Sequence, residues 1–218
     1  MPLQNRVDPF GMVHANTSRS LFTGNRGVLH DPATKTLLKR RWTTRAWIVC
    51  TCAYKGKHRE VMGRNTQSGN AGWTELFFLD EVTALAAGHR PCFTCRRAAA
   101  SEFLARHRTA SADPAALLPD LDRTLHAERR ASGGPPAPLD RATLRRLPEG
   151  AMLSAGGTPY AIRAAQALRW TFDGYDRAAP LADLDADDVT LLTPPVTLAI
   201  LRAGFAPVWH PSAAALAP

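Results

Sequence analysis

Long hydrophobic runs are missing from this chain of 218 residues: none approaches the roughly 18 residues needed to cross a bilayer. The first ten residues are polar and charged, so a secretory hydrophobic region is also lacking. We therefore expect a cytoplasmic protein with no membrane partner. Apolar residues nevertheless make up 45% of the chain, which excludes a disordered protein and predicts one large domain or two small ones.

Cysteine is scarce, and the chain's four cysteines form two close pairs, Cys50-Thr-Cys52 and Cys92-Phe-Thr-Cys95. Disulfides are rare in a reducing cytoplasm, whereas thiolates at such spacings are typical of tetrahedral Zn²⁺ sites. Residues i and i+2 of a strand face the same side, so both sulfurs of the first pair can reach one ion. The pattern predicts zinc held by all four cysteines. Two disulfides or four buried, unreactive thiols are the alternatives.

Acidic residues are few in the half that contains the cysteines. Residues 1–109 carry 17 Lys and Arg against 7 Asp and Glu, a balance of +10, whereas residues 110–218 carry 10 against 12, a balance of −2. This asymmetry is typical of a face that binds a polyanion, although a solvated basic surface is the alternative. The basic residues expected to contact nucleic acid are Arg26, Arg40, Arg41, Arg45, Lys55, Lys57, Arg90, Arg96 and Arg97.

Aromatic residues are interspersed with these basic residues. Trp42, Tyr54 and Trp73 could stack on bases, while Trp47 is expected in the core. Phosphate contacts by Lys and Arg would make binding fall steeply as the salt concentration rises.

Short β-branched and aromatic runs predict strands in the cysteine-containing half, at residues 47–54 and 75–79. The stretch from Asn5 to Asp31 is rich in Gly, Asn, Pro and Arg with few apolar residues, and its Thr-Gly-Asn-Arg-Gly sequence at 23–27 is expected to form a turn. Two helices are expected after the second strand. Asp80 would cap the first, and the second would run from Arg96 to about Arg108.

A helix at residues 114–130 and a Gly- and Pro-rich linker at 132–138 are expected to lead into a C-terminal part. Short strands are expected there at residues 151–154, 160–163, 168–172, 189–193 and 205–209. The predicted fold class is α+β. It comprises a zinc-stabilised α/β module at 1–110, a helical connection at 111–147 and a small β-rich, barrel-like domain at 148–218.

The segment from about Thr43 to Arg97 resembles the N-terminal metal-binding domain of the Ada family of DNA repair proteins. The similarity rests on the apolar strand ending at Cys50, on Phe77-Phe78 and on the helix followed by His89-Arg-Pro-Cys-Phe-Thr-Cys95. It covers about a quarter of the chain.

The resemblance implies a zinc ion held by four thiolates in a small module that contacts DNA phosphates. It also implies that Cys50 accepts a methyl group from a DNA methylphosphotriester. The first pair differs from the family's Cys-x-x-x-Cys, so a Cys₃His site completed by His58, His89 or His30 is the alternative to ligation by Cys52.

Histidine neighbourhoods suggest a catalytic alternative. His30 and Asp31 close a polar, Gly-flanked loop that also carries Arg26, and imidazole beside carboxylate suits general acid–base chemistry. His126 and His210 are further candidates for the same role.

The leading prediction is a zinc-containing nucleic-acid-binding protein, with DNA favoured over RNA, acting in DNA repair or in recognition of modified DNA. A nucleic-acid-processing hydrolase that uses the histidines is the second candidate. A zinc-stabilised module that binds a protein partner is the third.

Overall fold

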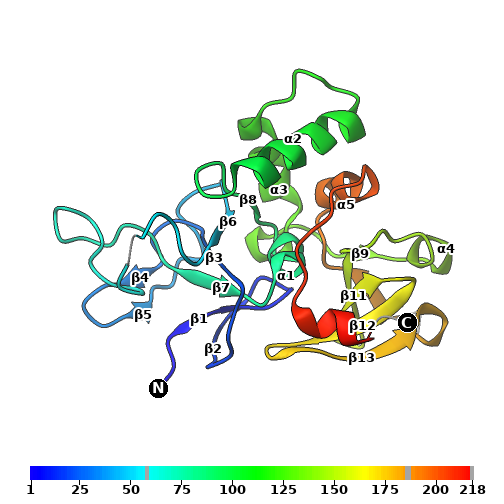
Figure 1. The fold of residues 1–218 in the computed structure, drawn as a ribbon, viewed down its shortest axis with the longest axis horizontal. Helices are drawn as coiled ribbons and strands as arrows, with labels where there is room; N and C mark the ends of the chain where they lie inside the picture. Colours follow the sequence, from blue (N-terminus) through cyan, green and yellow to red (C-terminus); the bar gives the residue numbers. More distant parts are fainter. Residues whose placement is uncertain (57–58, 185–187, 217–218) are drawn as a thin grey trace.

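The N-terminal half is built on a mixed sheet in the computed structural model, which describes residues 1–56, 59–184 and 188–216. The strand order is β2-β1-β7-β3-β6-β8, and a separate hairpin pairs β4 with β5 (Figure 1). These strands are β1 (Gln4–Val7), β2 (Val13–Ala15), β3 (Phe22–Asn25), β4 (His30–Asp31), β5 (Thr36–Leu37), β6 (Ile48–Thr51), β7 (Leu76–Phe78) and β8 (Arg90–Pro91).

The prediction of a turn at residues 23–27 was wrong for residues 23–25, which belong to β3, and the strands β1, β2 and β4 of the same polar stretch were missed. The strands are too short to show a clear alternation in the sequence, yet β1 and β3 each alternate between buried and more exposed residues. Gly24 lies inside β3 rather than at a turn. A Cβ atom there would collide with the Ile48 carbonyl oxygen of the neighbouring strand, so the glycine permits close pairing.

Helix α1 (Glu81–Ala86) lies between the two sheets of the molecule, and every one of its residues is buried (Figure 1). Asp80 caps it as expected, since its Oδ1 accepts the Thr83 N–H at 2.9 Å. The helix contributes Leu85, Val82 and Ala84 to three different hydrophobic clusters. It is therefore the central element that joins the N-terminal sheet to the rest of the protein.

The C-terminal part is an antiparallel sheet with strand order β13-β12-β11-β10-β14-β9. Four of the five expected strands are confirmed, and β9 and β13 were missed. The strands are β9 (Ala137–Pro138), β10 (Met152–Ala155), β11 (Thr158–Arg163), β12 (Gln166–Thr171), β13 (Gly174–Pro180) and β14 (Val189–Leu191).

Two expectations for this part were wrong. Residues 205–209 form no strand, and the sheet is open rather than barrel-like, because the structure pairs no described residue of edge strand β13 with edge strand β9. The 3₁₀ segment η4 (Pro211–Leu216) packs on β13 instead, and the β13 residue Tyr175 donates its N–H to Ser212 Oγ at 2.8 Å.

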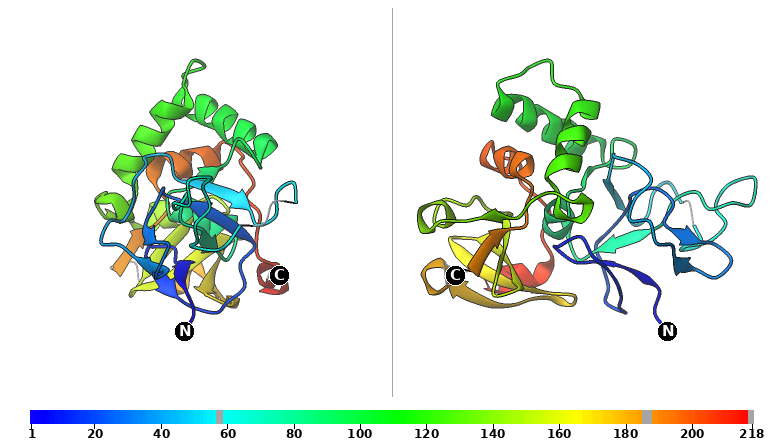
Figure 2. Two further views of the ribbon diagram at one scale, coloured as in Figure 1. Left: turned by 90° about the vertical axis from the view of Figure 1, so that its left-hand side faces the viewer. Right: turned by 180° about the vertical axis from the view of Figure 1, so that it is seen from behind.

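Helices α2, α3 and α5 gather at one end of the molecule, as the two further views in Figure 2 show, whereas α4 lies beside the C-terminal sheet (Figure 1). Phe103 of α2 meets Phe205, just after α5, with their ring centroids 5.0 Å apart. The helical segments are α2 (Arg97–Ser111), α3 (Leu118–Glu128), α4 (Arg141–Leu144), α5 (Pro195–Arg202), η1 (Arg130–Ser132) and η2 (Leu181–Asp183). Among the described residues, no helix has the length and apolar character needed to cross a membrane.

The largest core cluster crosses the expected domain borders at residues 110 and 147. It contains Leu85 and Phe103 from the N-terminal region, Leu121 from α3, and Leu153 and Leu198 from the C-terminal part. The expected linker at 132–138 also contributes to structure, since Ala137 and Pro138 pair with β14.

Candidate metal centre

Three cysteines converge where the N-terminal sheet meets α2. Cys50 lies on β6, Cys92 follows β8, and Cys95 precedes α2. The parallel pairing of β6 with β8 sets this arrangement, because the Cys92 N–H donates to the Val49 carbonyl at 3.0 Å. The three sulfur atoms all lie within 4.8 Å of one another, so they could hold one metal ion.

Hydrogen bonds within the cluster favour a negative charge on Cys92. A hydrogen bond from the Cys50 thiol and the backbone N–H groups of Cys95 and Thr94 lower the pKa of Cys92. Cys50 donates to Cys92 and is partly desolvated, so its own pKa is raised. The cluster thus stabilises the thiolate form of Cys92, which is the form that binds a cation.

The donor set fits zinc. Soft sulfur ligands suit Zn²⁺ as well as Cu(I) and iron–sulfur clusters, and Zn–S bonds of about 2.3 Å in a tetrahedron would place the sulfurs roughly 3.8 Å apart. The three sulfurs lie within 4.8 Å of one another, which is compatible with that spacing. Three protein sulfurs would occupy three of the four positions that zinc prefers.

Cys52 is not part of the cluster. Strand β6 ends at Thr51, so the two-residue alternation that was expected to align Cys52 with Cys50 does not extend to it. Its side chain is exposed, and its Sγ donates to the Leu21 carbonyl oxygen at 3.5 Å.

Two of the three histidines proposed as substitute ligands, His89 and His30, have other partners. The third, His58, lies outside the described residues. His89 is buried and accepts a hydrogen bond at Nε2 from Arg26 Nε at 3.2 Å. His30 is buried too, with Nδ1 2.7 Å from Thr74 Oγ1.

The basic residues expected to bind nucleic acid divide into two groups. Arg40, Arg41, Arg45, Lys55 and Arg97 are exposed, and Lys57 lies outside the described residues. Arg26 and Arg90 are buried, and the Arg96 side chain is only 8% exposed. These last three bind protein groups, so their assignment to nucleic-acid contact does not fit the structure.

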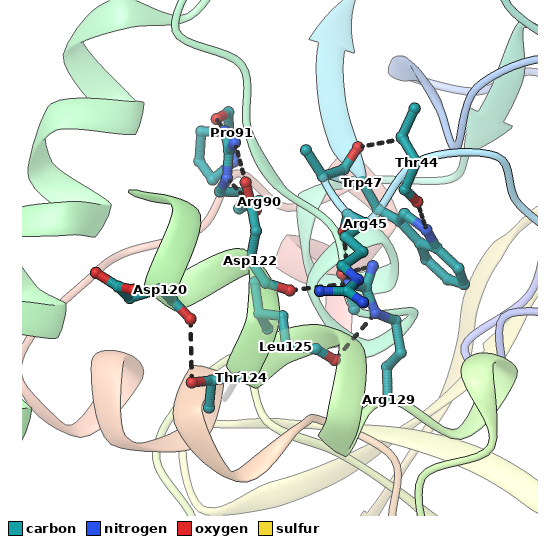
Figure 3. A network of polar contacts seen from close by, with 12 residues as sticks. Thr44, Arg45, Trp47, Arg90, Pro91, Asp120, Asp122, Thr124, Leu125 and Arg129 are labelled. Carbon is teal, nitrogen blue, oxygen red and sulfur yellow. Dashed lines mark hydrogen bonds and ion pairs between the residues drawn. The ribbon is translucent and has the colours of Figure 1, made fainter. Parts of the chain in front are cut away.

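Arg90 and Arg96 are neutralised by buried carboxylates. Arg90 forms a bidentate pair with Asp122, through Nε to Oδ1 at 2.7 Å and Nη2 to Oδ2 at 2.8 Å (Figure 3). Arg96 Nη1 lies 2.6 Å from Glu81 Oε1. Both arginines hold elements of the protein together.

Arg26 and Arg129 both stack on the buried Trp47 ring, each with its guanidinium carbon 4.0 Å from the ring centroid. Arg129, which the sequence did not single out, donates to the carbonyl oxygens of Leu125, Gly88, Arg45 and Asp122 (Figure 3). Burial lowers the pKa of each arginine to about 9, which leaves both charged at neutral pH. Trp47 is in the core, as expected.

The residues expected to serve catalysis do not form one site. His30 and Asp31 are consecutive on β4, and the Asp31 carboxylate accepts the Ala33 N–H at 2.8 Å. His126, on α3, packs against Trp42. His210 forms a hydrogen bond with Ser212 near β13. Cys50 belongs to the cysteine cluster, so the structure places these groups in separate surroundings.

Searches of protein-family models, of curated proteins and of solved structures found no match to this chain. The interpretation of the centre therefore rests on its own geometry.

Proposed function

We propose that this chain is a zinc protein whose centre joins β6, β8 and the start of α2. The observation that carries the proposal is the convergence of the Cys50, Cys92 and Cys95 sulfurs within 4.8 Å. Zinc bound there would fix the end of β6 against the first turn of α2. A water molecule or an exogenous group would take the fourth position.

We further propose that the elements ordered by the zinc bind nucleic acid, with DNA favoured over RNA. The support is the distribution of charge. Exposed basic residues precede β6 at residues 40–45, follow it at Lys55 and begin α2 at Arg97. Exposed arginine and lysine side chains neutralise phosphates and release the counterions of a nucleic acid.

Replacing Arg40, Arg41 and Arg45 together by Gln tests this proposal in the full chain. The matched control replaces three other exposed arginines by Gln and so removes the same charge. These residues are Arg141, Arg145 and Arg146. We expect the first variant to bind a labelled duplex oligonucleotide more weakly in fluorescence anisotropy. The slope of log K against the logarithm of the salt concentration should also become shallower by about 0.9 for each phosphate contact that is lost. An equal loss of oligonucleotide affinity in both variants would show that binding depends on net charge alone, and it would contradict the proposal.

A narrower proposal concerns DNA repair, with Cys50 as the acceptor of a methyl group. The Cys50 thiolate, which zinc binding would leave deprotonated, would form a bond to the methyl carbon while the carbon–oxygen bond of a methylphosphotriester breaks, and the phosphodiester anion would leave with the electron pair of that bond. We expect intact-mass spectrometry to find one added methyl group on Cys50 after incubation with methylated DNA, and none in a Cys50→Ser variant. An unchanged mass of the zinc-loaded protein would exclude the repair role while leaving the nucleic-acid proposal intact.

The hydrolase alternative receives no support from a specific contact, because His30, His126 and His210 have different neighbours. A protein-interaction module likewise has no particular observation in its favour.

A further inference from the structure

A pocket of about 450 Å³ opens beside the segment that leads into β6. Three parts of the chain form it: the turn between β1 and β2, residues 41–42, and the segment that includes η1. Its lining contains two aromatic rings and two arginines but no carboxylate. The lining residues are Phe10, Met12, Arg41, Trp42, Arg130, Ala131, Ser132 and Gly133.

The Trp42 ring is held in a defined orientation at this pocket. It meets the His126 ring edge-on, with the centroids 5.3 Å apart, and lies 6.2 Å from the Trp47 ring. Contacts of this kind fix an indole without covering all of it, and Trp42 remains partly exposed. A fixed, accessible indole is a suitable platform for stacking a nucleobase.

Positively charged side chains lie both at the pocket surface and behind it. Arg41 and Arg130 line the pocket. Arg26 lies behind the turn that contains Gly11 and donates to the Gly11 carbonyl oxygen at 2.8 Å. A Cβ atom on Gly11 would lie 2.6 Å from Ala131 Cβ and 3.5 Å from Arg26 Nη2, which places this guanidinium next to the pocket wall. Arg26 Nη2 is buried and has no hydrogen-bond partner among the described residues.

No carboxylate of residues 1–56, 59–184 or 188–216 forms an ion pair with either lining arginine. Arg41 Nη1 contacts the Met12 sulfur at 3.3 Å, and Arg130 Nη1 donates to Thr190 Oγ1 at 3.3 Å. Arg26 lies buried behind them and forms no ion pair with a carboxylate of the described residues. Burial lowers the pKa of Arg26, and the nearby Asp8 carboxylate offsets that effect only in part. An anion in the pocket would therefore experience a net attractive field.

We propose that this pocket binds one unpaired nucleotide of a nucleic-acid strand, with the base stacked on Trp42 and its phosphate held by Arg41 and Arg130. The inference rests on the proposed nucleic-acid function and names its substrate as single-stranded. Aromatic stacking combined with arginine contacts is the usual way in which proteins hold unpaired bases.

The test compares Trp42→Leu with Trp209→Leu in the full, zinc-loaded chain. Trp209 is the matched control because it is also partly exposed and packs on an arginine, Arg163, whose guanidinium carbon lies 5.0 Å from the ring centroid. We expect Trp42→Leu to weaken binding of a short single-stranded oligonucleotide by about 5- to 150-fold, since one stacked base contributes roughly 1–3 kcal/mol. Trp209→Leu should bind like the parent chain, and Trp42→Leu should bind a duplex almost unchanged.

A crosslinking measurement on the unaltered protein keeps the proposal testable if Trp42→Leu does not fold. Ultraviolet irradiation with a bromouracil-containing oligonucleotide should join the strand to the peptide that carries Trp42. Crosslinking elsewhere only, or equal affinity of Trp42→Leu and the parent chain, would overturn the pocket proposal while the wider nucleic-acid function stands. Equal affinity for a free mononucleotide and for the strand would overturn strand recognition. Absence of any oligonucleotide binding at low salt would overturn both proposals.

Discussion

Arginine has two different roles at the scale of single residues, and burial separates them. Arg90 lies in a bidentate pair with Asp122, and the two side chains are 9% and 11% exposed. Arg123 pairs with Asp120 on the same helix, α3, but those side chains are 64% and 53% exposed. A buried pair cannot exchange its partner for water, whereas an exposed pair can, so loss of a partner is expected to cost more at the buried pair.

Replacing Asp122 by Asn should therefore destabilise the protein strongly. The substitution leaves the Arg90 charge buried without a counterion, and the expected cost is about 3–5 kcal/mol in the free energy of unfolding. Asp120→Asn on the same helix is the control, with an expected cost of about 0–1 kcal/mol. Urea denaturation measures both values. Equal costs would show that the buried pair has no special role.

The same residue scale marks the limit of what the sequence could predict about charge. Clustering of basic residues was visible, but the sequence did not distinguish Arg26, Arg90 and Arg96, which bind protein groups, from the exposed Arg97. The partners of the first three come from up to 63 residues away in the chain. Only the fold brings such partners together.

At the scale of elements, the length of β6 decides which cysteines form the centre. Runs of β-branched and aromatic residues predicted a strand from 47 to 54, and the observed strand covers Ile48–Thr51. This difference of a few residues removes Cys52 from the cluster while Cys50 stays in it. The approach of Cys92 to Cys95 before α2 was predictable because it needs only a local turn. In this turn the Arg96 N–H donates to the Cys92 carbonyl at 2.9 Å.

Two helix caps of identical local pattern should differ in their contribution to stability. Asp80 and Asp140 each accept the N–H of a threonine three residues later, at 2.9 Å and 2.6 Å. Asp80 is buried and also accepts the Tyr175 hydroxyl at 2.9 Å and the His210 N–H at 3.1 Å, whereas Asp140 is exposed.

Asp140→Ala should cost about 1 kcal/mol, the usual value of an N-cap, in the free energy of unfolding. Asp80→Ala leaves several buried donors without an acceptor, and we expect a cost of about 3 kcal/mol or more. Thermal or urea unfolding of the two variants measures the difference. Similar costs would contradict the role of Asp80 in joining α1 to the C-terminal sheet.

At the scale of the whole molecule, the sequence predicted an α+β composition, helices α1 to α3 and four strands of the C-terminal sheet, but missed most strands of the N-terminal sheet and the way the elements assemble. Local propensity predicts helices and hairpins well, and the hairpins around residues 156–157 and 173–174 are present. The central position of α1 depends on contacts among three separate hydrophobic clusters, and no local pattern carries that information. The division into parts at residues 110 and 147 stays a prediction, although the largest cluster crosses both positions.

The metal content of the purified chain tests the central claim most directly. We expect mass-spectrometric metal analysis to find one zinc ion per chain in the parent protein and in Cys52→Ser, because Cys52 lies outside the three-sulfur cluster. Cys92→Ser should lose most of the zinc, since serine supplies no thiolate. Absence of bound metal from the parent chain, or full zinc content in Cys92→Ser, would contradict the account.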